Sequence, residues 1–236
     1  MVNNTEDNLI QKFQFHSNSV FSGLTEEDIQ EIDENMRYRK YKTGKNIFVE
    51  GAYPSGIFYV KEGKIKKYKS YSEGKEQIIY ICTHGEFFGY SALLSGEPYA
   101  DSSAALEDST IGYLPKDVFI KILNRSTVLS LTLLKNLSHE FGVMINNVVT
   151  YAHRTVRERV ALSLILLNHK YKTDTPNETA TEIVLPREDL ANMVGTAVET
   201  LTRLLRQFKE EGLIEIKGRK IILLNEPQLL KIADQY

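Results

Sequence analysis

Apolar residues follow the period of short strands through much of the first half of the chain, between residues 40 and 113. Short runs rich in Ile, Val, Phe and Tyr occur there, namely NIFVE, IFYVK, KIKKYKSY, EQIIYIC and STIGYL, and glycines punctuate them. Runs of β-branched and aromatic residues between glycine turns predict antiparallel strands joined by hairpins. The pattern therefore predicts an antiparallel sandwich or barrel of the jelly-roll kind.

The residues before this region carry a weaker pattern. Residues 1–14 are polar and rich in Asn, which favours a loose lead-in. Further on, Thr25 suits a helix N-cap and Asp28 the third helical position, with Ile29 and Ile32 on the inward side. We expect a short helix there.

A long helical period follows the predicted strands. Its apolar residues step by three and four along the chain: Leu134, Leu137, Phe141, Met144, Val148 and Tyr151. This spacing is typical of the a/d seam of a short two-stranded coiled coil. Leu133, Ile145 and Val149 lie off the seam, where they can pack on the strands. The alternative is a single helix buried on its own domain.

Two short amphipathic periods separated by Gly195 occupy residues 185–213. Pro186 suits the first helical position, and Leu190, Met193 and Val194 share one face of the first period. The second period has an apolar face and a polar face, made respectively by Leu201, Leu204, Leu205 and Phe208 and by Glu199, Thr202, Arg203 and Arg206. Two helices joined by a tight glycine turn predict a helix-turn-helix, whose second helix can enter the DNA major groove.

The polar face of the second helix has two interpretations. A carboxylate can accept from cytosine N4 and an arginine can bind guanine O6 and N7, and Glu199 and Arg203 share one surface. In the structural alternative, Thr196 and Glu199 form a capping box, and Glu199 and Arg203 form an ordinary ion pair. The next residues, GLIEIKGRKIILLN, favour DNA binding, because they predict two strands around a basic turn from Lys217 to Lys220 that could hold phosphates.

Composition narrows the classes of function. The net charge of −2 gives no overall nucleic-acid signal, so any DNA affinity must come from local basic clusters. The single cysteine, Cys82, excludes a disulfide framework within the chain and a clustered-cysteine iron–sulfur site, and we interpret it as a small apolar strand residue. The longest apolar run, residues 160–167, is too short to span a bilayer, and we find no signal peptide. We therefore expect a cytoplasmic protein without a membrane partner.

Motifs for enzyme or metal chemistry do not occur. A jelly-roll can hold a metal when several imidazoles and carboxylates converge inside it, but only His84 lies in the strand region. The other histidines are scattered and are interpreted as surface or capping residues: His16, His139, His153 and His169. The chain contains no G-x-S-x-G, P-loop or HEXXH string. We predict no enzyme activity, no metal site and no cofactor.

The string VGTAVETLTRLLRQFKEEGLIEIKGRKIIL resembles the DNA-binding domain of the Crp/Fnr superfamily of bacterial transcription regulators, and V-E-T-L-T-R is most similar to its fumarate and nitrate reduction branch. In that branch a Val-Glu pair, a hydroxyl residue and an arginine face the bases, although the hydroxyl residue is usually serine. The expected DNA-binding residues, including those at positions that contact the DNA backbone in relatives, are Arg187, Thr196, Val198, Glu199, Thr202, Arg203, Lys217 and Arg219. The resemblance implies RNA polymerase as a further partner.

The strings TGKNIFVEG, FYVKEGKIK and HGEFFGYSALLSGEP resemble the cyclic-nucleotide-binding β-roll of the same superfamily. In relatives that bind cyclic AMP, a Glu in this loop holds the ribose and an Arg about eight residues later holds the phosphate. Here the first position falls in Gly89-Tyr90-Ser91, and the Arg position falls on Ala100, with Asp101 beside it. A phosphate without a cation loses its charge-assisted hydrogen bonds and would face Asp101, so the site should repel an anion.

The helix side of this pocket also departs from the family pattern. The polar pair that relatives offer to the base becomes Met144 and Ile145. We therefore expect that cyclic AMP and cyclic GMP do not bind. The pocket is either closed by its own side chains, with Tyr90 and Tyr99 as candidates, or takes an unknown, less anionic small-molecule effector.

The sequence thus predicts an α+β chain with an N-terminal antiparallel β-roll of jelly-roll type, a long dimerisation helix and a C-terminal winged helix-turn-helix. The expected boundaries are 1–122 for the sensor β-roll, 123–152 for the dimerisation helix and hinge, and 153–236 for the DNA-binding domain. The expected function is a homodimeric transcription regulator that binds double-stranded DNA at an inverted repeat with TGA or TTGA half-sites. The alternative is a cyclic-nucleotide-binding-domain scaffold or effector-binding protein that does not bind DNA.

Overall fold

The computed structural model describes residues 2–15, 20–71, 74–174 and 181–234. The chain forms two compact units. One unit is Phe15–Phe141, and the other combines Met1–Gln14 with Gly142–Tyr236. The sequence-based boundaries lie at residues 122 and 152, whereas the contacts divide the chain inside a single long helix and group its first fourteen residues with the C-terminal elements.

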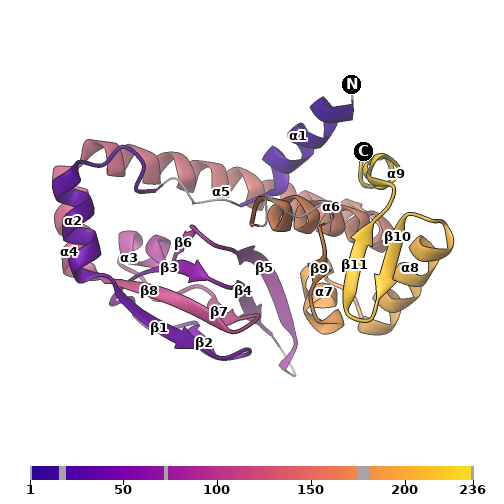
Figure 1. Cartoon of the computed structure of the whole chain (residues 1–236), viewed down its shortest axis with the longest axis horizontal. Coiled ribbons are helices and arrows are strands. Elements are labelled where there is room, and N and C mark those ends of the chain that lie inside the picture. Colours follow the sequence, from indigo (N-terminus) through magenta and orange to yellow (C-terminus); the bar gives the residue numbers. More distant parts are fainter. Residues whose placement is uncertain (1, 16–19, 72–73, 175–180, 235–236) are drawn as a thin grey trace. The chain divides into compact units, whose positions relative to one another are not determined.

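The unit Phe15–Phe141 is built on two four-stranded antiparallel sheets (Figure 1), which confirms the predicted β-roll. Their strand orders are β1-β8-β3-β6 and β2-β7-β4-β5. The strands are β1 (Arg37–Tyr41), β2 (Asn46–Phe48), β3 (Gly56–Glu62), β4 (Ile65–Ser70), β5 (Glu76–Cys82), β6 (Phe87–Phe88), β7 (Ser102–Ala105) and β8 (Ser109–Pro115). Gly63 shows why glycine is needed at one turn: its φ is +85°, and an added Cβ would lie 2.3 Å from Ser109 Oγ.

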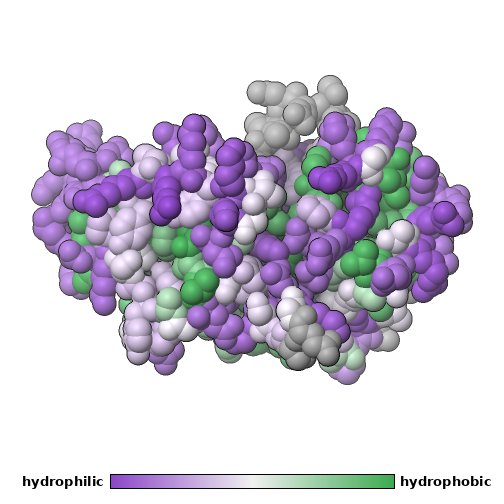
Figure 2. Space-filling view, turned by 90° about the horizontal axis from the view of Figure 1, so that it is seen from below, coloured by the Kyte–Doolittle hydropathy of each residue, from purple (hydrophilic) through white to green (hydrophobic). Residues whose placement is uncertain are grey.

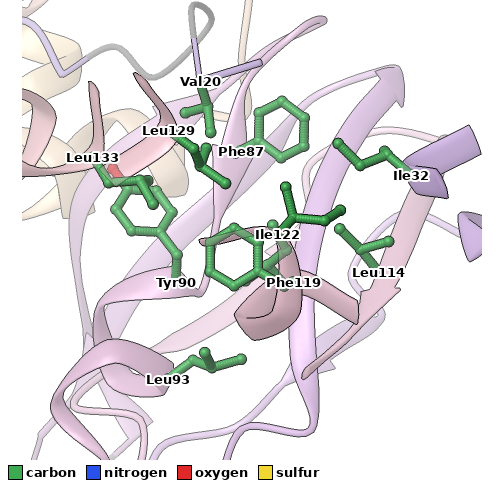
Figure 3. Close-up of a cluster of buried hydrophobic side chains, with 11 residues drawn as sticks. Val20, Ile32, Phe87, Tyr90, Leu93, Leu114, Phe119, Ile122, Leu129 and Leu133 are labelled. Carbon is green, nitrogen blue, oxygen red and sulfur yellow. The ribbon is translucent and has the colours of Figure 1, made fainter. Parts of the chain in front are cut away.

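Three short helices pack with these sheets: α2 (Glu26–Asn35), α3 (Tyr90–Ser95) and α4 (Lys116–Arg125). Figure 3 shows their shared core, in which Tyr90, Phe119 and Ile122 lie among side chains of β6, β8 and the long helix α5 (Thr127–His153). Phe119 has no exposed surface, and burying a side chain of this size stabilises a fold by about 1.5–3 kcal/mol. On the face shown in Figure 2, hydrophilic residues predominate and hydrophobic ones are scattered among them.

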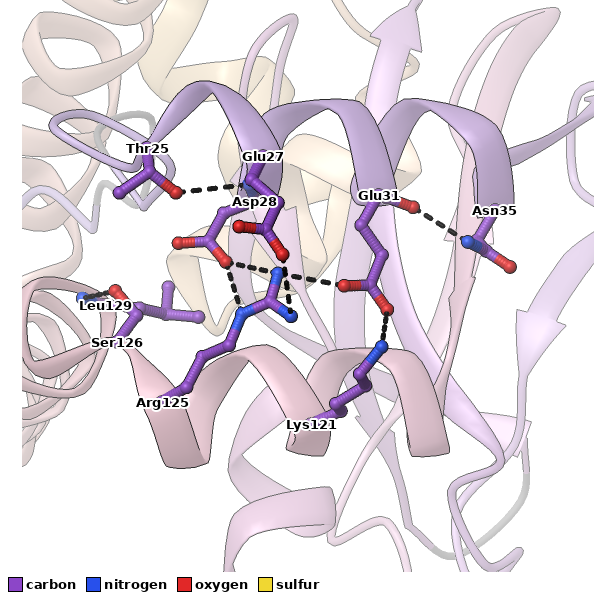
Figure 4. A network of polar contacts seen from close by, with 9 residues as sticks. All are labelled: Thr25, Glu27, Asp28, Glu31, Asn35, Lys121, Arg125, Ser126 and Leu129. Carbon is purple, nitrogen blue, oxygen red and sulfur yellow. Dashed lines mark hydrogen bonds and ion pairs between the residues drawn. The ribbon is translucent and has the colours of Figure 1, made fainter.

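Charged side chains join α2 to α4 (Figure 4). As predicted, Thr25 caps α2 and accepts a hydrogen bond from the Asp28 backbone N–H, and Ile32 is buried. Ile29 was predicted to face inward, but it is 42% exposed, because Asp28 takes the inward position. Burial alone would raise the pKa of Asp28, but hydrogen bonds from Arg125 and Thr25 outweigh it and lower that pKa. The Arg125 Nη2 to Asp28 Oδ1 distance is 2.6 Å.

The long helix α5 (Thr127–His153) carries apolar residues on two faces. Leu129, Leu133 and Val143 are buried. Leu134, Phe141 and Val148, three of the predicted seam residues, are 61%, 69% and 67% exposed. A row of large apolar side chains in water is typical of an interaction surface.

Two details of the predicted seam differ from the structure. Leu137 packs against the core of its own unit instead of facing outward. Leu133 is buried as expected, but the prediction is wrong for Ile145 and Val149, which are 49% and 53% exposed. The physical reason is that the β-roll unit ends at Phe141, so later residues of α5 belong to the other unit.

The second unit is mainly helical, with a three-stranded sheet of order β10-β11-β9. Its elements are α1 (Val2–Phe13), α6 (Val156–Asp174), β9 (Ile183–Val184), α7 (Arg187–Val194), α8 (Val198–Glu210), β10 (Ile214–Lys217), β11 (Lys220–Leu223) and α9 (Glu226–Ala233). The predicted loose lead-in is wrong, because α1 is a helix that contacts α6 and α9. Its apolar residues Leu9, Ile10 and Phe13 are buried, and Arg154 lies over the Phe13 ring at 5.1 Å.

Candidate nucleic-acid interface

Helices α7 and α8 form the predicted helix-turn-helix. Gly195 ends α7 with a φ of 71°, and its N–H donates to the Ala191 carbonyl at 2.9 Å, which is a typical glycine C-cap. Pro186 stands at the N-cap of α7, one position earlier than expected. The apolar side chains Leu190, Val194, Leu201, Leu204, Leu205 and Phe208 are buried, so both helices turn their predicted apolar faces inward.

The opposite face of α8 is accessible. Val198, Glu199, Thr202 and Arg203 are all exposed. The Thr202 hydroxyl donates to the Val198 carbonyl at 2.8 Å, which leaves its oxygen able to accept a further bond. Within the described residues, neither Glu199 nor Arg203 forms an ion pair, so both charged groups remain available to a ligand.

The structural alternative for this face is not formed. The N-cap of α8 is Ala197, which has no side-chain cap, so Thr196 and Glu199 make no capping box. Thr196 is half-buried, and its backbone N–H donates to the Ala191 carbonyl at 3.1 Å. Neither of the two interactions that would explain these residues without a ligand is present among the described residues.

Strands β10 and β11 pair antiparallel from Ile214↔Leu223 to Lys217↔Lys220, with Gly218 at a φ of 61° in the turn. Lys217 pairs with Glu215 at 2.9 Å and Lys220 with Glu182 at 2.5 Å, both at the surface. Arg219 is exposed. Surface pairs of this kind contribute little and exchange readily for other partners, so the turn can present its cations to phosphates.

Arg187 lies beside this turn. Its Nη1 and Nη2 atoms lie 3.4 Å and 3.5 Å from the carbonyl oxygens of Arg219 and Gly218. Burial lowers the pKa of the Arg187 guanidinium. Arg187 therefore joins the start of α7 to the wing, as well as being a predicted phosphate contact.

Sequence reasoning missed two residues that hold the helix-turn-helix in place. Arg159 on α6 donates to the carbonyls of Val194 and Gly195 at 3.0 Å and 3.1 Å, and the Tyr151 hydroxyl donates to the Met193 carbonyl at 2.8 Å. These bonds satisfy carbonyls at the end of α7 that have no partner within the helix. Hydrophobic periodicity carries no signal for such contacts, because each donor is far along the chain from its acceptor.

The predicted effector residues in the β-roll fall into two groups. Tyr90, Tyr99 and Asp101 lie inside the unit. Tyr90 is 2% exposed, and its hydroxyl donates to Glu140. The Tyr99 ring stacks on that of Phe48, with 3.9 Å between the ring centres. Gly89 lies with them, because a Cβ added there would be 3.6 Å from the Tyr99 ring. Gly89 is the N-cap of α3, whereas the exposed residues are Ser91, Ala100, Met144 and Ile145.

Asp101 has a cationic partner, which the sequence did not indicate. Its Oδ2 atom lies 2.9 Å from Lys67 Nζ, and the two side chains are 13% and 7% exposed. Neither Lys67 nor Glu140 could be selected from the sequence, because neither belongs to a recognised motif. In the described part of the chain, no group of three or more His, Cys, Asp or Glu residues is arranged to hold a metal ion, and no helix is long and apolar enough to cross a membrane.

Comparisons with known proteins cover both halves of the chain. The cyclic nucleotide-binding domain family matches residues 38–126, and the Crp-like helix-turn-helix domain matches residues 158–232. The fumarate and nitrate reduction regulatory protein of Vibrio cholerae is 24% identical over 211 residues, 89% of this chain and 84% of the relative. The transcriptional activator protein anr of Pseudomonas aeruginosa is 26% identical, with coverages of 89% and 86%. The structure of FixK2 from Bradyrhizobium japonicum is similar with a TM-score of 0.76 at 20% identity, covering 85% of this chain and 98% of that chain.

Proposed function

The chain belongs to the Crp/Fnr superfamily of bacterial transcription regulators, and we propose that it acts as a cytoplasmic homodimer on an inverted-repeat operator. The observation that carries this proposal is the exposed face of α8, where Glu199 and Arg203 have no ion-pair partner among the described residues. Arg203 would bind a guanine, and Glu199 would accept from the amino group of a cytosine or adenine. By resemblance to the fumarate and nitrate reduction branch, each half-site contains TGA within a TTGA sequence.

Three of the remaining proposed contacts position the protein on DNA without reading its sequence. Lys217 and Arg219 at the wing turn are suited to phosphates, as is Arg187 beside it. Val198, Thr196 and Thr202 lie on or next to the reading face of α8. RNA polymerase is a further proposed partner, on the family resemblance alone.

Selection from random DNA tests this function. A gel shift with the full chain and a pool of randomised duplexes should enrich an inverted repeat of TTGA-type half-sites, because two-fold related recognition helices contact successive major grooves about 34 Å apart. The competing function is a cyclic-nucleotide-binding-domain scaffold, which would enrich no sequence. A pool that stays random while the chain remains folded and dimeric would favour the scaffold.

We propose further that the effector is not cyclic AMP or cyclic GMP. Lys67, a buried cation of the β-roll, is already paired with Asp101, and Tyr90 and Tyr99 are buried in the same unit. An entering phosphate would have to break that ion pair and leave Asp101 unpaired in the interior.

Calorimetry with the full chain and cyclic AMP checks this expectation. We expect no heat of binding at micromolar nucleotide and no change in operator affinity on adding it. The control is Lys67→Met, which removes the cation and leaves Asp101 without its ion-pair partner, and it should not bind the nucleotide either. Micromolar binding to the natural chain, or a nucleotide-dependent gain in operator affinity, would contradict the proposal.

A further inference from the structure

A row of polar side chains crosses the inner face of the sheet β2-β7-β4-β5. Lys67 on β4 lies opposite Ser103 on β7 and opposite Tyr80 on β5 in the strand register. The Lys67 ammonium lies 2.9 Å from Asp101 and 5.1 Å from the centre of the Tyr80 ring. Directly opposed residues of adjacent strands point to the same face, so these groups form one cluster inside the β-roll.

Helix α5 contributes a second carboxylate to this cluster. Glu140 accepts a hydrogen bond from the Tyr90 hydroxyl, and Tyr90 is itself buried in the core drawn in Figure 3. Glu140 also interacts electrostatically with Lys67 and Asp101. The bond between Tyr90 and Glu140 therefore ties α3, next to the sheets, to α5.

The charges in this interior do not balance when every group is ionised. The described ionisable groups that face Glu140 are Lys67 from β4, Asp101 before β7, Tyr90 from α3, Tyr80 from β5 and His139 from α5 itself, with Cys82 and Glu86 close to the tyrosines. At neutral pH the tyrosines are uncharged, because burial raises their pKa values further. The Lys67 ammonium then stands against the carboxylates of Asp101 and Glu140, with the buried carboxylate of Glu86 nearby, and one proton on Glu140 would reduce the excess negative charge.

Two buried polar atoms of this region make no hydrogen bond among the described residues. Ser103 Oγ, opposite Lys67, and Asn136 Nδ2, one turn before Glu140 on α5, are buried and have no partner among the described residues. Unsatisfied polar atoms in a native interior call for a specific explanation, and partly satisfied networks stabilise charge poorly. Burial accordingly raises the pKa of Glu140, and this exceeds the opposing effects of Tyr90, Lys67 and His139.

We propose that Glu140 is a proton-binding site through which the β-roll acts on α5, so that acidity is an effector of this regulator. When Glu140 is protonated, the pair of Lys67 and Asp101 remains electrically neutral, and the Tyr90 hydrogen bond between α3 and α5 is kept. Ionised Glu140 accepts a stronger, charge-assisted hydrogen bond from Tyr90, but it also adds a second carboxylate charge to a partly buried site. The cost of removing that charge from water is the larger effect, so ionisation weakens the packing of α5 at this point. The consequence for DNA rests on the proposed function, whereas the proton site itself does not.

The direction of the pH dependence follows from the raised pKa. The usual pKa of a glutamate carboxyl is 4.5, and that of Glu140 is higher in the folded state. Such a carboxyl stabilises the folded state fully when the pH is below the usual pKa. This contribution is lost as the pH rises through the raised value. Glu140→Gln mimics the protonated side chain, so its stability should lack this dependence on pH.

The experiment compares the natural chain with Glu140→Gln from about pH 5 to about pH 8, the range over which proteins are ordinarily stable. The melting temperature of the natural chain should fall relative to that of Glu140→Gln as the pH rises. At the acid end of the range, the natural chain and Glu140→Gln should bind the operator with equal affinity. At higher pH the two affinities should differ, by about tenfold for each unit by which the pKa of Glu140 differs between the free and the DNA-bound protein. Glu97→Gln makes the same change at an exposed position after α3 and should retain the profile of the natural chain.

An infrared titration gives a direct readout that a structural role alone would not produce. The natural chain should show a protonated-carboxyl band that disappears as pH rises, and Glu140→Gln should lack it. If Glu140→Gln does not fold, Tyr90→Phe replaces it, and its band should titrate at a different pH because the hydrogen bond to Glu140 is gone. Parallel melting profiles of the natural chain and Glu140→Gln, or an unchanged infrared titration, would overturn the proposal. Melting and infrared measurements use no DNA, so a failure of the proposed operator binding would leave them intact.

Discussion

Phe141→Glu is expected to convert the protein to a monomer and to reduce operator affinity by roughly 100- to 10,000-fold, the factor that linking two binding modules typically supplies. Phe141 is 69% exposed in the middle of the apolar row on α5. In a two-fold dimer its substitution would bring two carboxylates face to face in an apolar layer, where unpaired charges are costly. Sedimentation measures the oligomeric state, and a gel shift measures the affinity.

A matched control separates loss of the seam from a general effect of charge on α5. Leu131→Glu makes the same kind of change at an apolar residue that is 52% exposed but lies before Leu134, the first residue of the predicted seam. It should stay dimeric and keep its operator affinity. A Phe141→Glu protein that still sediments as a dimer would show that the subunits meet elsewhere.

Arg203→Ala is expected to relax operator specificity at a single base pair. A bidentate contact between arginine and guanine contributes about 1–3 kcal/mol of discrimination, which is roughly 5- to 150-fold in affinity for the correct base over others. Arg203 is exposed, so its loss should leave the melting temperature nearly unchanged. The measurement is a set of affinities for duplexes that carry each of the four base pairs at the guanine position.

Lys217→Ala supplies the contrasting result. A phosphate contact carries no sequence information, so this change should weaken binding to cognate and scrambled duplexes alike. It should also reduce the slope of log affinity against log salt concentration by about one. Lys217 pairs with Glu215 at the surface, so its replacement should leave the fold and the melting temperature nearly unchanged. Equal losses on cognate and scrambled DNA for Arg203→Ala would exclude it as a base-reading residue.

The helix-turn-helix could be predicted from the sequence because its signals are local. The apolar face of α8, the turn at Gly195 and the wing around Gly218 each depend on spacing within a few residues, and the structure confirms all three. The β-roll was predictable for the same reason, since strand composition and glycine turns recur along the chain. Helix α1 was missed, because a short polar helix gains most of its stability from packing against α6 and α9, which lie far away in sequence.

The sequence by itself determined most element types, the division into a β-rich and a helix-turn-helix half, and the exposed polar face of α8, because hydrophobic period and turn chemistry act over short distances. Tertiary structure alone decided which distant charges meet. Lys67 reaches Asp101 because β4 pairs with β7, and Glu140 reaches Tyr90 because α5 packs beside α3 in the common core. Tertiary packing also decided which predicted seam residues of α5 are exposed: Leu137 packs inward, whereas Phe141 faces solvent. Burial and charge pairing depend on every element that surrounds a side chain, and no local pattern records them.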